Sequence, residues 1–274
     1  MTRTSPLLAL LPLALLVAGC ASSGTRLEMS TALDQSLAAT QRPQADRDRD
    51  LWRHPRQTLL FFGLRPNMTV IELDPGTGWY TQVLAPVLRE RGRYIAALPP
   101  VSPQQRGAMR ERERLEAVIA SRPQALDRIQ RAPFNPGVEP LAPDNSVDLV
   151  VTFRSLHNWM AEDKARAAFA DVFRALKPGG VLGIVEHRGN PQQQQDPKAA
   201  SGYVNEATAM RLIESAGFRL VATSEINANS RDTKDHPRGV WNLPPTLADG
   251  DKDRARYLAI GESDRFTFKF VKPR

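Results

Sequence analysis

The sequence predicts an α/β fold built on a doubly wound, mostly parallel sheet. Three short apolar runs, at residues 69–73, 147–153 and 181–186, have the composition of strands buried on both faces of a parallel sheet. The first run passes through the turn D-P-G-T-G, residues 74–78, into an apolar helical pattern that begins at Trp79. A strand, a glycine turn and a helix place free N–H groups at the carboxyl edge of a sheet, where open α/β folds bind ligands.

Several known motifs can be compared with this glycine turn. A dinucleotide-binding fingerprint requires a third glycine where the chain has Thr81, and a phosphate-binding P-loop requires Gly-Lys-Ser/Thr, which is absent. A plain turn with two glycines stays possible, because Gly-x-Gly alone is a weak signal. The stretch from Glu72 to Gly78 resembles the first motif of the class I S-adenosylmethionine-dependent methyltransferases, an acid followed by a Gly-x-Gly loop. Asp74 departs from the pattern, since it stands where that family most often has its first glycine.

The resemblance implies a fold, a cofactor and a set of binding residues. The fold is a seven-stranded Rossmann-like sheet with an antiparallel C-terminal hairpin, expected at residues 219–224 and 264–271. The implied cofactor is S-adenosyl-L-methionine. Its expected binding residues are the following: Glu72, Asp74, Gly76, Thr77, Gly78, Tyr80 and Arg154. Stretches at 153–160, 186–188, 239–246 and 261–266 look like a subfamily of predicted, often exported bacterial methyltransferases, and this resemblance covers roughly residue 46 to the C-terminus.

The predicted second and third strands depart from the family pattern. The second, at residues 92–98, runs into Pro99-Pro100 where the family usually has an acid that binds the ribose hydroxyl groups. The third is expected near residues 126–129, within a proline-rich connection. Before the first strand, the resemblance implies a helix that covers the cofactor, so Arg53 and His54 are candidates to face the site. A surface position near the start of this helix is the favoured alternative.

Candidate catalytic residues follow the predicted strand at residues 147–153. His157 and Asn158 lie just past it, where a methyl acceptor is expected. Methyl transfer depends mainly on alignment of the acceptor; a histidine can take up a proton if the acceptor must lose one, and an asparagine can hold the acceptor through its amide. A histidine that only bonds backbone at the strand end explains His157 equally well. No His-x-x-x-His or Cys/His spacing occurs, so no metal site is predicted.

The N-terminus predicts export and lipid attachment. Arg3 is followed by an apolar run, Leu7–Ala18, and by the stretch V-A-G-C that ends at Cys20. This resembles a bacterial lipoprotein signal, in which Cys20, the only cysteine of the chain, becomes the acylated first residue. Ala21 favours the periplasmic side of the outer membrane. The expected organisation is a signal peptide at 1–19, a tether and N-terminal segment at 20–45, and a methyltransferase-like domain at 46–274.

The net charge of +7 does not predict a nucleic-acid partner. Basic and acidic residues alternate, as in R-E-R-E-R at residues 110–114, which is typical of a solvated helix face.

The resemblance makes a methyltransferase of a small-molecule acceptor the leading function, and it leaves the oligomeric state open. The alternative is a non-catalytic ligand-binding lipoprotein of the same fold. S-adenosylmethionine is made in the cytoplasm, so the expected export leaves three explanations open: imported or leaked cofactor, retention of the chain inside the cell, or a fold kept for binding only. Asp74 and the missing ribose acid favour the third. A nicotinamide oxidoreductase ranks far below both.

Overall fold

The computed structural model describes residues 16–274, and for residues 16–23 and Thr25 it describes the backbone alone. Most of the expected signal peptide, at residues 1–15, and the side chain of Cys20 therefore lie outside the described part of the chain. Among the helices of residues 16–274, none combines the length and the apolar composition needed to cross a bilayer.

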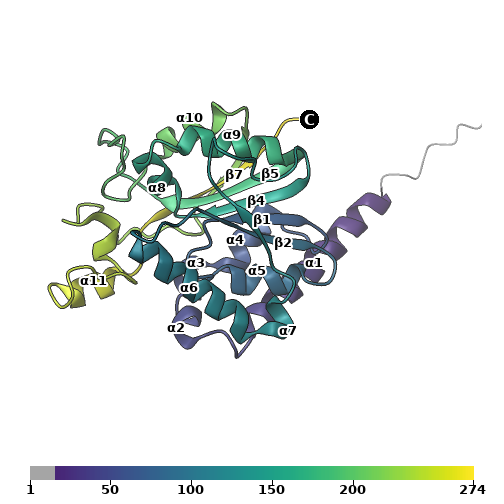
Figure 1. Cartoon of the computed structure of the whole chain (residues 1–274), viewed down its shortest axis with the longest axis horizontal. Helices are drawn as coiled ribbons and strands as arrows, with labels where there is room; N and C mark the ends of the chain where they lie inside the picture. The colour runs from purple at the N-terminus through teal and green to yellow at the C-terminus, as the bar shows by residue number, and fades with distance from the viewer. Residues whose placement is uncertain (1–15) are drawn as a thin grey trace, which may run out of the picture.

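A single seven-stranded sheet, with the order β3-β2-β1-β4-β5-β7-β6, forms the centre of the described chain (Figure 1). The strands are β1 (Thr69–Leu73), β2 (Arg93–Leu98), β3 (Gln130–Pro133), β4 (Val147–Phe153), β5 (Leu176–His187), β6 (Arg219–Ser224) and β7 (Arg265–Val271). β7 runs antiparallel to β5 and β6, whereas the pairs from β3 to β5 are parallel. This confirms the predicted doubly wound sheet and its antiparallel C-terminal pair. The chain order reverses between β1 and β4, which is where such sheets bind ligands.

Helices cover both faces of the sheet (Figure 1). One layer contains α1 (Leu16–Ala38), α4 (Pro55–Phe62), α5 (Thr81–Leu88), α6 (Arg106–Ser121) and α7 (Pro123–Leu126). The other contains α8 (Leu156–Ala161), α9 (Ala165–Ala175) and α10 (Glu206–Glu214). The remaining short helices are α2 (Gln44–Arg47), α3 (Asp50–Arg53), the 3-10 helix η1 (Gly239–Asn242) and α11 (Arg254–Ile260).

Two apolar cores lie on opposite faces of the sheet. Successive side chains of β1 alternate between them, because Ile71 and Leu73 pack with the α9 layer and Val70 packs with the α5 layer. Both faces of the central strands are thus buried, which explains why their sequences are continuous apolar runs.

The second half of α1 packs on the domain. Met29 and Leu33 are fully buried in the core that also contains α5, and the Ser36 hydroxyl donates a hydrogen bond of 3.0 Å to the carbonyl of Val83. Sequence analysis placed these residues in the segment that precedes the domain. Their burial shows that at least residues 29–36 contribute to its core.

Two sequence expectations about local structure are corrected. The third strand is β3, residues 130–133, whereas residues 126–129 contain the end of helix α7 and the turn after it. β3 lies at the sheet edge and is mostly exposed, so hydropathy carries no signal for it. The strand predicted at residues 181–186 is longer than expected, because β5 already begins at Leu176 and pairs there with Val147.

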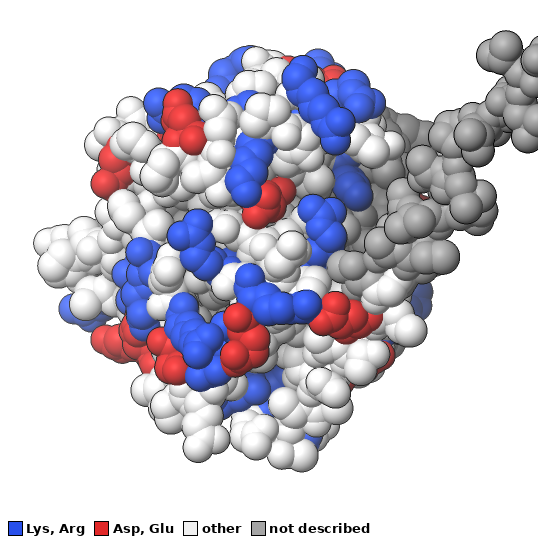
Figure 2. Space-filling model, turned by 90° about the vertical axis from the view of Figure 1, so that its right-hand side faces the viewer, with Lys and Arg blue, Asp and Glu red and all other residues white. Residues whose placement is uncertain are grey.

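The surface charge is mixed, as the sequence indicates. Figure 2 shows basic side chains scattered over one face of the molecule and interspersed with acidic ones. Exposed ion pairs include Arg131 with Glu116 at 2.5 Å and Arg56 with Asp34 at 2.7 Å. Such exposed pairs contribute little to stability. On the face drawn in Figure 2, acidic and uncharged residues separate the basic side chains.

Candidate functional site

A cavity of about 760 Å³ opens at the carboxyl edge of the sheet, over β1, β2 and β4. Its walls come from the glycine turn after β1, from residues 98–102 after β2, from residues 153–155 after β4, and from side chains of α6 and α8. The volume lies within the range of small-molecule and cofactor sites. The place is the one that the reversal of strand order predicts.

The cavity brings most of the expected cofactor residues together. Those that line it are Glu72, Asp74, Gly76, Thr77, Tyr80 and Arg154. Gly78 instead shapes the turn, with a φ of +85°, and a Cβ at this position would approach Leu115 Cδ1 of α6 at 2.8 Å. Only glycine adopts this conformation without strain, so Gly78 determines how closely α6 approaches the turn.

Glu72 is the buried acid at the end of β1. Its carboxylate accepts hydrogen bonds from the hydroxyl of Tyr94 and, at 3.2 Å, from the hydroxyl of Thr81. Burial raises the pKa of Glu72 to about 7, although both hydrogen bonds oppose this rise. The group therefore titrates near neutral pH at the floor of the cavity.

Asp74 presents a free carboxylate oxygen to the same cavity. Its Oδ2 accepts a hydrogen bond of 2.7 Å from the indole N–H of Trp159, while its buried Oδ1 has no partner within residues 16–274. The backbone has a φ of +48°, a conformation that favours the glycine which the family usually has here. Burial raises the pKa of Asp74 to about 6, a change that the Trp159 bond opposes. An orphaned buried oxygen suits a cationic or hydrogen-bond-donating ligand.

Arg53 is buried in the cavity wall, and the expectation of a surface position was wrong. Its Nε donates to Glu262 at 3.4 Å, and its guanidinium lies over the ring of Trp79 at 4.5 Å. Arg154 also lines the cavity and has a φ of +61°. Burial lowers the pKa of Arg154 to about 10 and that of Arg53 well below its usual value. The structure shows the alternative position, in which Arg53 faces the site, and its partner Glu262 lies at the other end of the chain.

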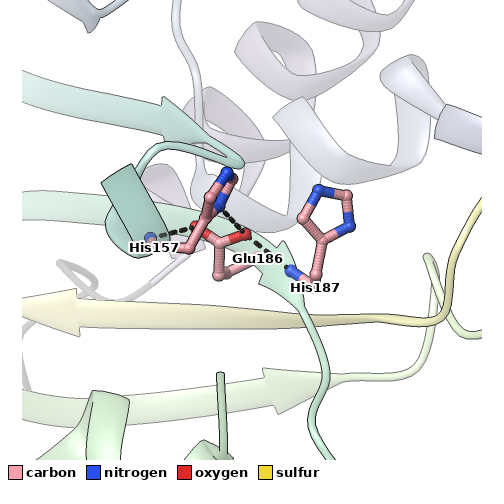
Figure 3. Close-up of side chains that lie close together, drawn as sticks. All are labelled: His157, Glu186 and His187. Carbon is pink, nitrogen blue, oxygen red and sulfur yellow. Dashed lines mark hydrogen bonds and ion pairs between the residues drawn. The ribbon is translucent and has the colours of Figure 1, made fainter. Parts of the chain in front are cut away.

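The two candidate catalytic residues lie in different environments. Asn158 is exposed and lines the cavity, whereas the buried His157 is not among the residues that line it. His157 Nδ1 lies 3.2 Å from Glu186, and the backbone N–H of His157 donates to the same carboxylate at 3.3 Å (Figure 3). Glu186 thus holds both the ring and the backbone of His157.

His157, Glu186 and His187 form a cluster whose potential ligand atoms lie within 4.8 Å of one another (Figure 3). Its members come from α8 and the end of β5, so no sequence spacing could reveal it. The oxygens of Glu186 already accept bonds from His157 and from the backbone of His187. Burial lowers the pKa of His187 well below its usual value, and His157 and Arg265 lower it further. The same positive charges would repel a divalent cation. We therefore interpret the cluster as a hydrogen-bonded network and not as a metal site.

Glu111 of α6 is a residue of the cavity that sequence analysis missed. It lines the cavity together with Pro99 and Pro100, where β2 lacks the expected acid. The neighbouring Arg112 donates a hydrogen bond of 2.8 Å to the carbonyl of Pro99, which holds α6 against the end of β2. Glu111 therefore brings a carboxylate to this part of the cavity from a helix instead of from the strand.

The chain is similar in sequence to known methyltransferases. Residues 71–184 match the family model described as a methyltransferase domain. The chain is 26% identical over 214 residues to the ubiquinone/menaquinone biosynthesis C-methyltransferase UbiE of Hydrogenovibrio crunogenus, with 77% of this chain and 75% of that protein covered. For UbiE of Shewanella piezotolerans the identity is 29% over 136 residues, 50% of this chain and 48% of that protein, so the chain spans about half of its length.

Solved structures share the fold at low sequence identity. A SAM-dependent methyltransferase from Aquifex aeolicus has a TM-score of 0.55 at 17% identity, with 82% of this chain and 93% of that chain covered. The [4+2]-cyclase SpnF has a TM-score of 0.56 at 16% identity, covering 92% and 96%. Phosphoethanolamine N-methyltransferase 2 of Haemonchus contortus, in complex with S-adenosyl-L-methionine, has a TM-score of 0.52 at 18% identity, covering 81% and 53%.

The family match and these structures support S-adenosylmethionine as the cofactor. They say nothing about the lipoprotein signal. The sheet order, the glycine turn and these structures lead to one conclusion: the chain has the Rossmann-like fold of the class I methyltransferases, and its residues 71–184 are similar to a methyltransferase domain.

Proposed function

We propose that this protein is an S-adenosylmethionine-dependent methyltransferase that acts on a small-molecule acceptor. The observation that carries the proposal is the cavity of about 760 Å³ whose wall is the glycine turn of the matched methyltransferase domain. The named relatives include methyltransferases of small molecules, such as the UbiE proteins.

In this proposal the cofactor supplies a methyl group activated by a sulfonium, and the protein binds and aligns both reactants. Gly76 lets the backbone approach the amino-acid end of the cofactor, since nothing lies within 4 Å of a Cβ built there. The free oxygen of Asp74 meets the positive charge of the cofactor. Glu111 accepts hydrogen bonds from the ribose hydroxyl groups, a role that the family gives to an acid at the end of the second strand. Asn158 holds the acceptor, and His157 is positioned behind it by Glu186.

Isothermal titration of the purified protein with S-adenosylmethionine and S-adenosylhomocysteine tests this function. Two glycine-to-alanine variants form a matched pair. Gly76 and Gly250 have φ values of +56° and +63°, and neither has any atom within 4 Å of a built Cβ. The backbone strain of about 1 kcal/mol is therefore similar in both variants, but only Gly76 lines the cavity.

We expect Gly76→Ala to weaken binding of both ligands at least tenfold, because the added methyl group occupies the space of the approaching ligand. Gly250→Ala should change it by less than about twofold. Equal affinities in the two variants, or no binding of either ligand to the wild-type protein, would refute the proposed function.

We further propose that Cys20 is lipidated and that the protein is anchored to the periplasmic side of a bacterial membrane. The support is the apolar run that ends in V-A-G-C. Since the chain is packed on the domain from Met29 onward, the anchor would hold the domain close to the bilayer. Cys20→Ser should abolish lipid labelling and shift the protein out of the membrane fraction or leave an unprocessed precursor. Unchanged labelling and fractionation would contradict the proposal.

A further inference from the structure

We propose that the methyl acceptor carries an oxyanion group, a carboxylate or a phosphate, and that Arg154 and Arg53 bind it in the cavity. This inference rests on the proposed function, because it concerns the acceptor of the same site. It starts from two guanidinium groups whose hydrogen-bonding capacity is not fully used by the described part of the protein.

Arg154 has no side-chain hydrogen bond or ion pair to any residue in the described part of the chain, although it lines the cavity. Its position is set by the backbone, since the N–H of Arg154 donates to the carbonyl of Val185 at 2.8 Å and its φ is +61°. A non-glycine residue in this conformation carries strain, which is often found at ligand sites. The fold therefore holds an unpaired guanidinium against the cavity.

Arg53 has a second unused donor. Its Nη1 is buried and has no hydrogen-bond partner within residues 16–274, while its Nε is directed at Glu262. The carbonyl of Arg53 accepts a bond of 3.3 Å from Tyr80, and the Tyr80 ring stacks on Phe153 at 3.5 Å between centroids. Because Phe153 directly precedes Arg154, the stacked rings connect the two segments that carry the arginines.

The surrounding charge is strongly positive. Arg49, Arg265 and Glu262 act on the pKa of both Arg154 and Arg53, and Arg154 also lowers the pKa of Arg53. Four guanidinium groups thus face one carboxylate, a surplus of three positive charges. Glu262 is saturated, since it pairs with Arg49 at 2.6 Å, with Arg53 and with Arg265. Buried charges are tolerated best when they are paired, so an additional anion would stabilise this cluster.

The net charge of the cofactor does not offset this surplus. Its carboxylate and its ammonium group cancel, and the sulfonium adds one positive charge, so S-adenosylmethionine as a whole is cationic. Ionisation of Glu72, which lies close enough to Arg154 and Arg53 for their charges to lower its pKa, would reduce the surplus only from three to two. The remaining positive charge matches an anionic acceptor.

The cavity also separates its charges into two sides. The charged groups that act on Asp74 are Glu162, Glu111 and Lys164, so its side is acidic and suits the cationic cofactor. The groups that act on Arg154 are mainly arginines. Arginine binds planar oxyanions through two parallel N–H donors, which explains why this side would recognise a carboxylate or a phosphate.

The experiment measures anion binding to the full-length protein saturated with S-adenosylhomocysteine, so that the carboxylate of the cofactor is already bound. The probes are benzoate, phenyl phosphate and the neutral analogue benzamide, each followed by calorimetry. The variants are Arg154→Gln, Arg154→Lys and the control Arg219→Gln. Arg219 is an exposed residue of β6 and its replacement removes the same charge far from the lining of the cavity.

We expect at least one of the two anions to bind the loaded wild-type protein at least tenfold more tightly than benzamide. Which anion binds identifies the oxyanion as carboxylate or phosphate. Arg154→Gln should lower its affinity at least tenfold and that of S-adenosylhomocysteine less than threefold. Arg154→Lys should retain an intermediate affinity, because it keeps the charge and loses the paired donors. Arg219→Gln should match the wild type.

Three results would overturn the inference. The first is the absence of anion binding to the loaded wild-type protein. The second is a parallel loss of S-adenosylhomocysteine affinity in Arg154→Gln, which would assign this arginine to the carboxylate of the cofactor. The third is equal anion affinity in Arg154→Gln and Arg219→Gln. If S-adenosylhomocysteine does not bind, the proposed function fails by itself. The anion titration is then repeated without S-adenosylhomocysteine. Anion binding that Arg154→Gln weakens and Arg219→Gln does not would support the arginine site, and equal binding in the two variants would refute it.

Discussion

Replacement of Asp74 by asparagine tests both the electrostatics of the cavity and its role toward the cofactor. Burial raises the pKa of Asp74 to about 6 from an ordinary value of 3.8, with Trp159 as its only hydrogen-bond donor within residues 16–274. Each pKa unit corresponds to about 1.4 kcal/mol, so the buried carboxylate lowers the free energy of unfolding by about 3 kcal/mol at pH 8.

The sign of the pH dependence follows from the raised pKa. The folded protein binds the proton of Asp74 more tightly than the unfolded chain, so stability rises as the pH falls from about 6 to about 4. Above pH 6 the full cost of the ionised group is present. Asparagine carries no charge and its amide oxygen can still accept the bond from Trp159, so Asp74→Asn removes this cost.

Urea unfolding at pH 8 and at pH 4 measures the difference. At pH 8 we expect Asp74→Asn to be more stable than the wild type by up to about 3 kcal/mol, with the difference shrinking toward zero at pH 4. Comparison at each pH cancels the titration of groups that both proteins share, such as Glu72. A variant less stable than the wild type at pH 8, or a difference that does not depend on pH, would refute the reasoning.

The same variant reports on ligand charge. S-adenosylmethionine carries a sulfonium and S-adenosylhomocysteine does not, so the carboxylate of Asp74 should favour the first. At pH 8 the preference of the wild type should exceed that of Asp74→Asn several-fold. It should decrease below pH 6 as Asp74 is protonated. Equal preferences in the two proteins would show that Asp74 does not interact with the charge of the cofactor.

Three further substitutions test other parts of the structure. Burial raises the pKa of Glu72 to about 7, so stability should fall as the pH rises from about 4.5 to 7; Glu72→Gln should flatten this dependence in thermal melts between pH 5 and 8, and an unchanged slope would contradict the assignment. His157→Ala should lower the free energy of unfolding by about 1–3 kcal/mol, because it leaves buried Glu186 short of one partner. If urea titrations show that His157→Ala is as stable as the wild type, the structural role is contradicted and a role of His157 as a base is favoured. Gly183→Ala places a methyl group 2.5 Å from the ring of Phe62, and calorimetry should show a loss of about 1–3 kcal/mol from overpacking; an unchanged melting temperature would argue against this contact.

The sequence alone was sufficient to predict the fold and to single out the glycine turn that lines the cavity. Apolar runs such as residues 69–73 and 147–153 show which strands are buried on both faces, because burial selects composition locally. The glycine turn shows where a ligand can approach the backbone, because Gly76 and Gly78 adopt positive φ values that other residues rarely take. Both signals act over a few residues, so they can be recognised without the rest of the chain.

The tertiary structure alone decided the chemistry around that site. Arg53 was expected at the surface and is buried because Glu262, 209 positions along the chain, pairs with it. The acid expected at the end of β2 is absent there, and α6 brings Glu111 to the same cavity. His157, also expected at the cavity, is held against Glu186. These positions depend on contacts between distant segments, whose energies arise only when the packed sheet brings the side chains together, and no pattern of neighbouring residues encodes them.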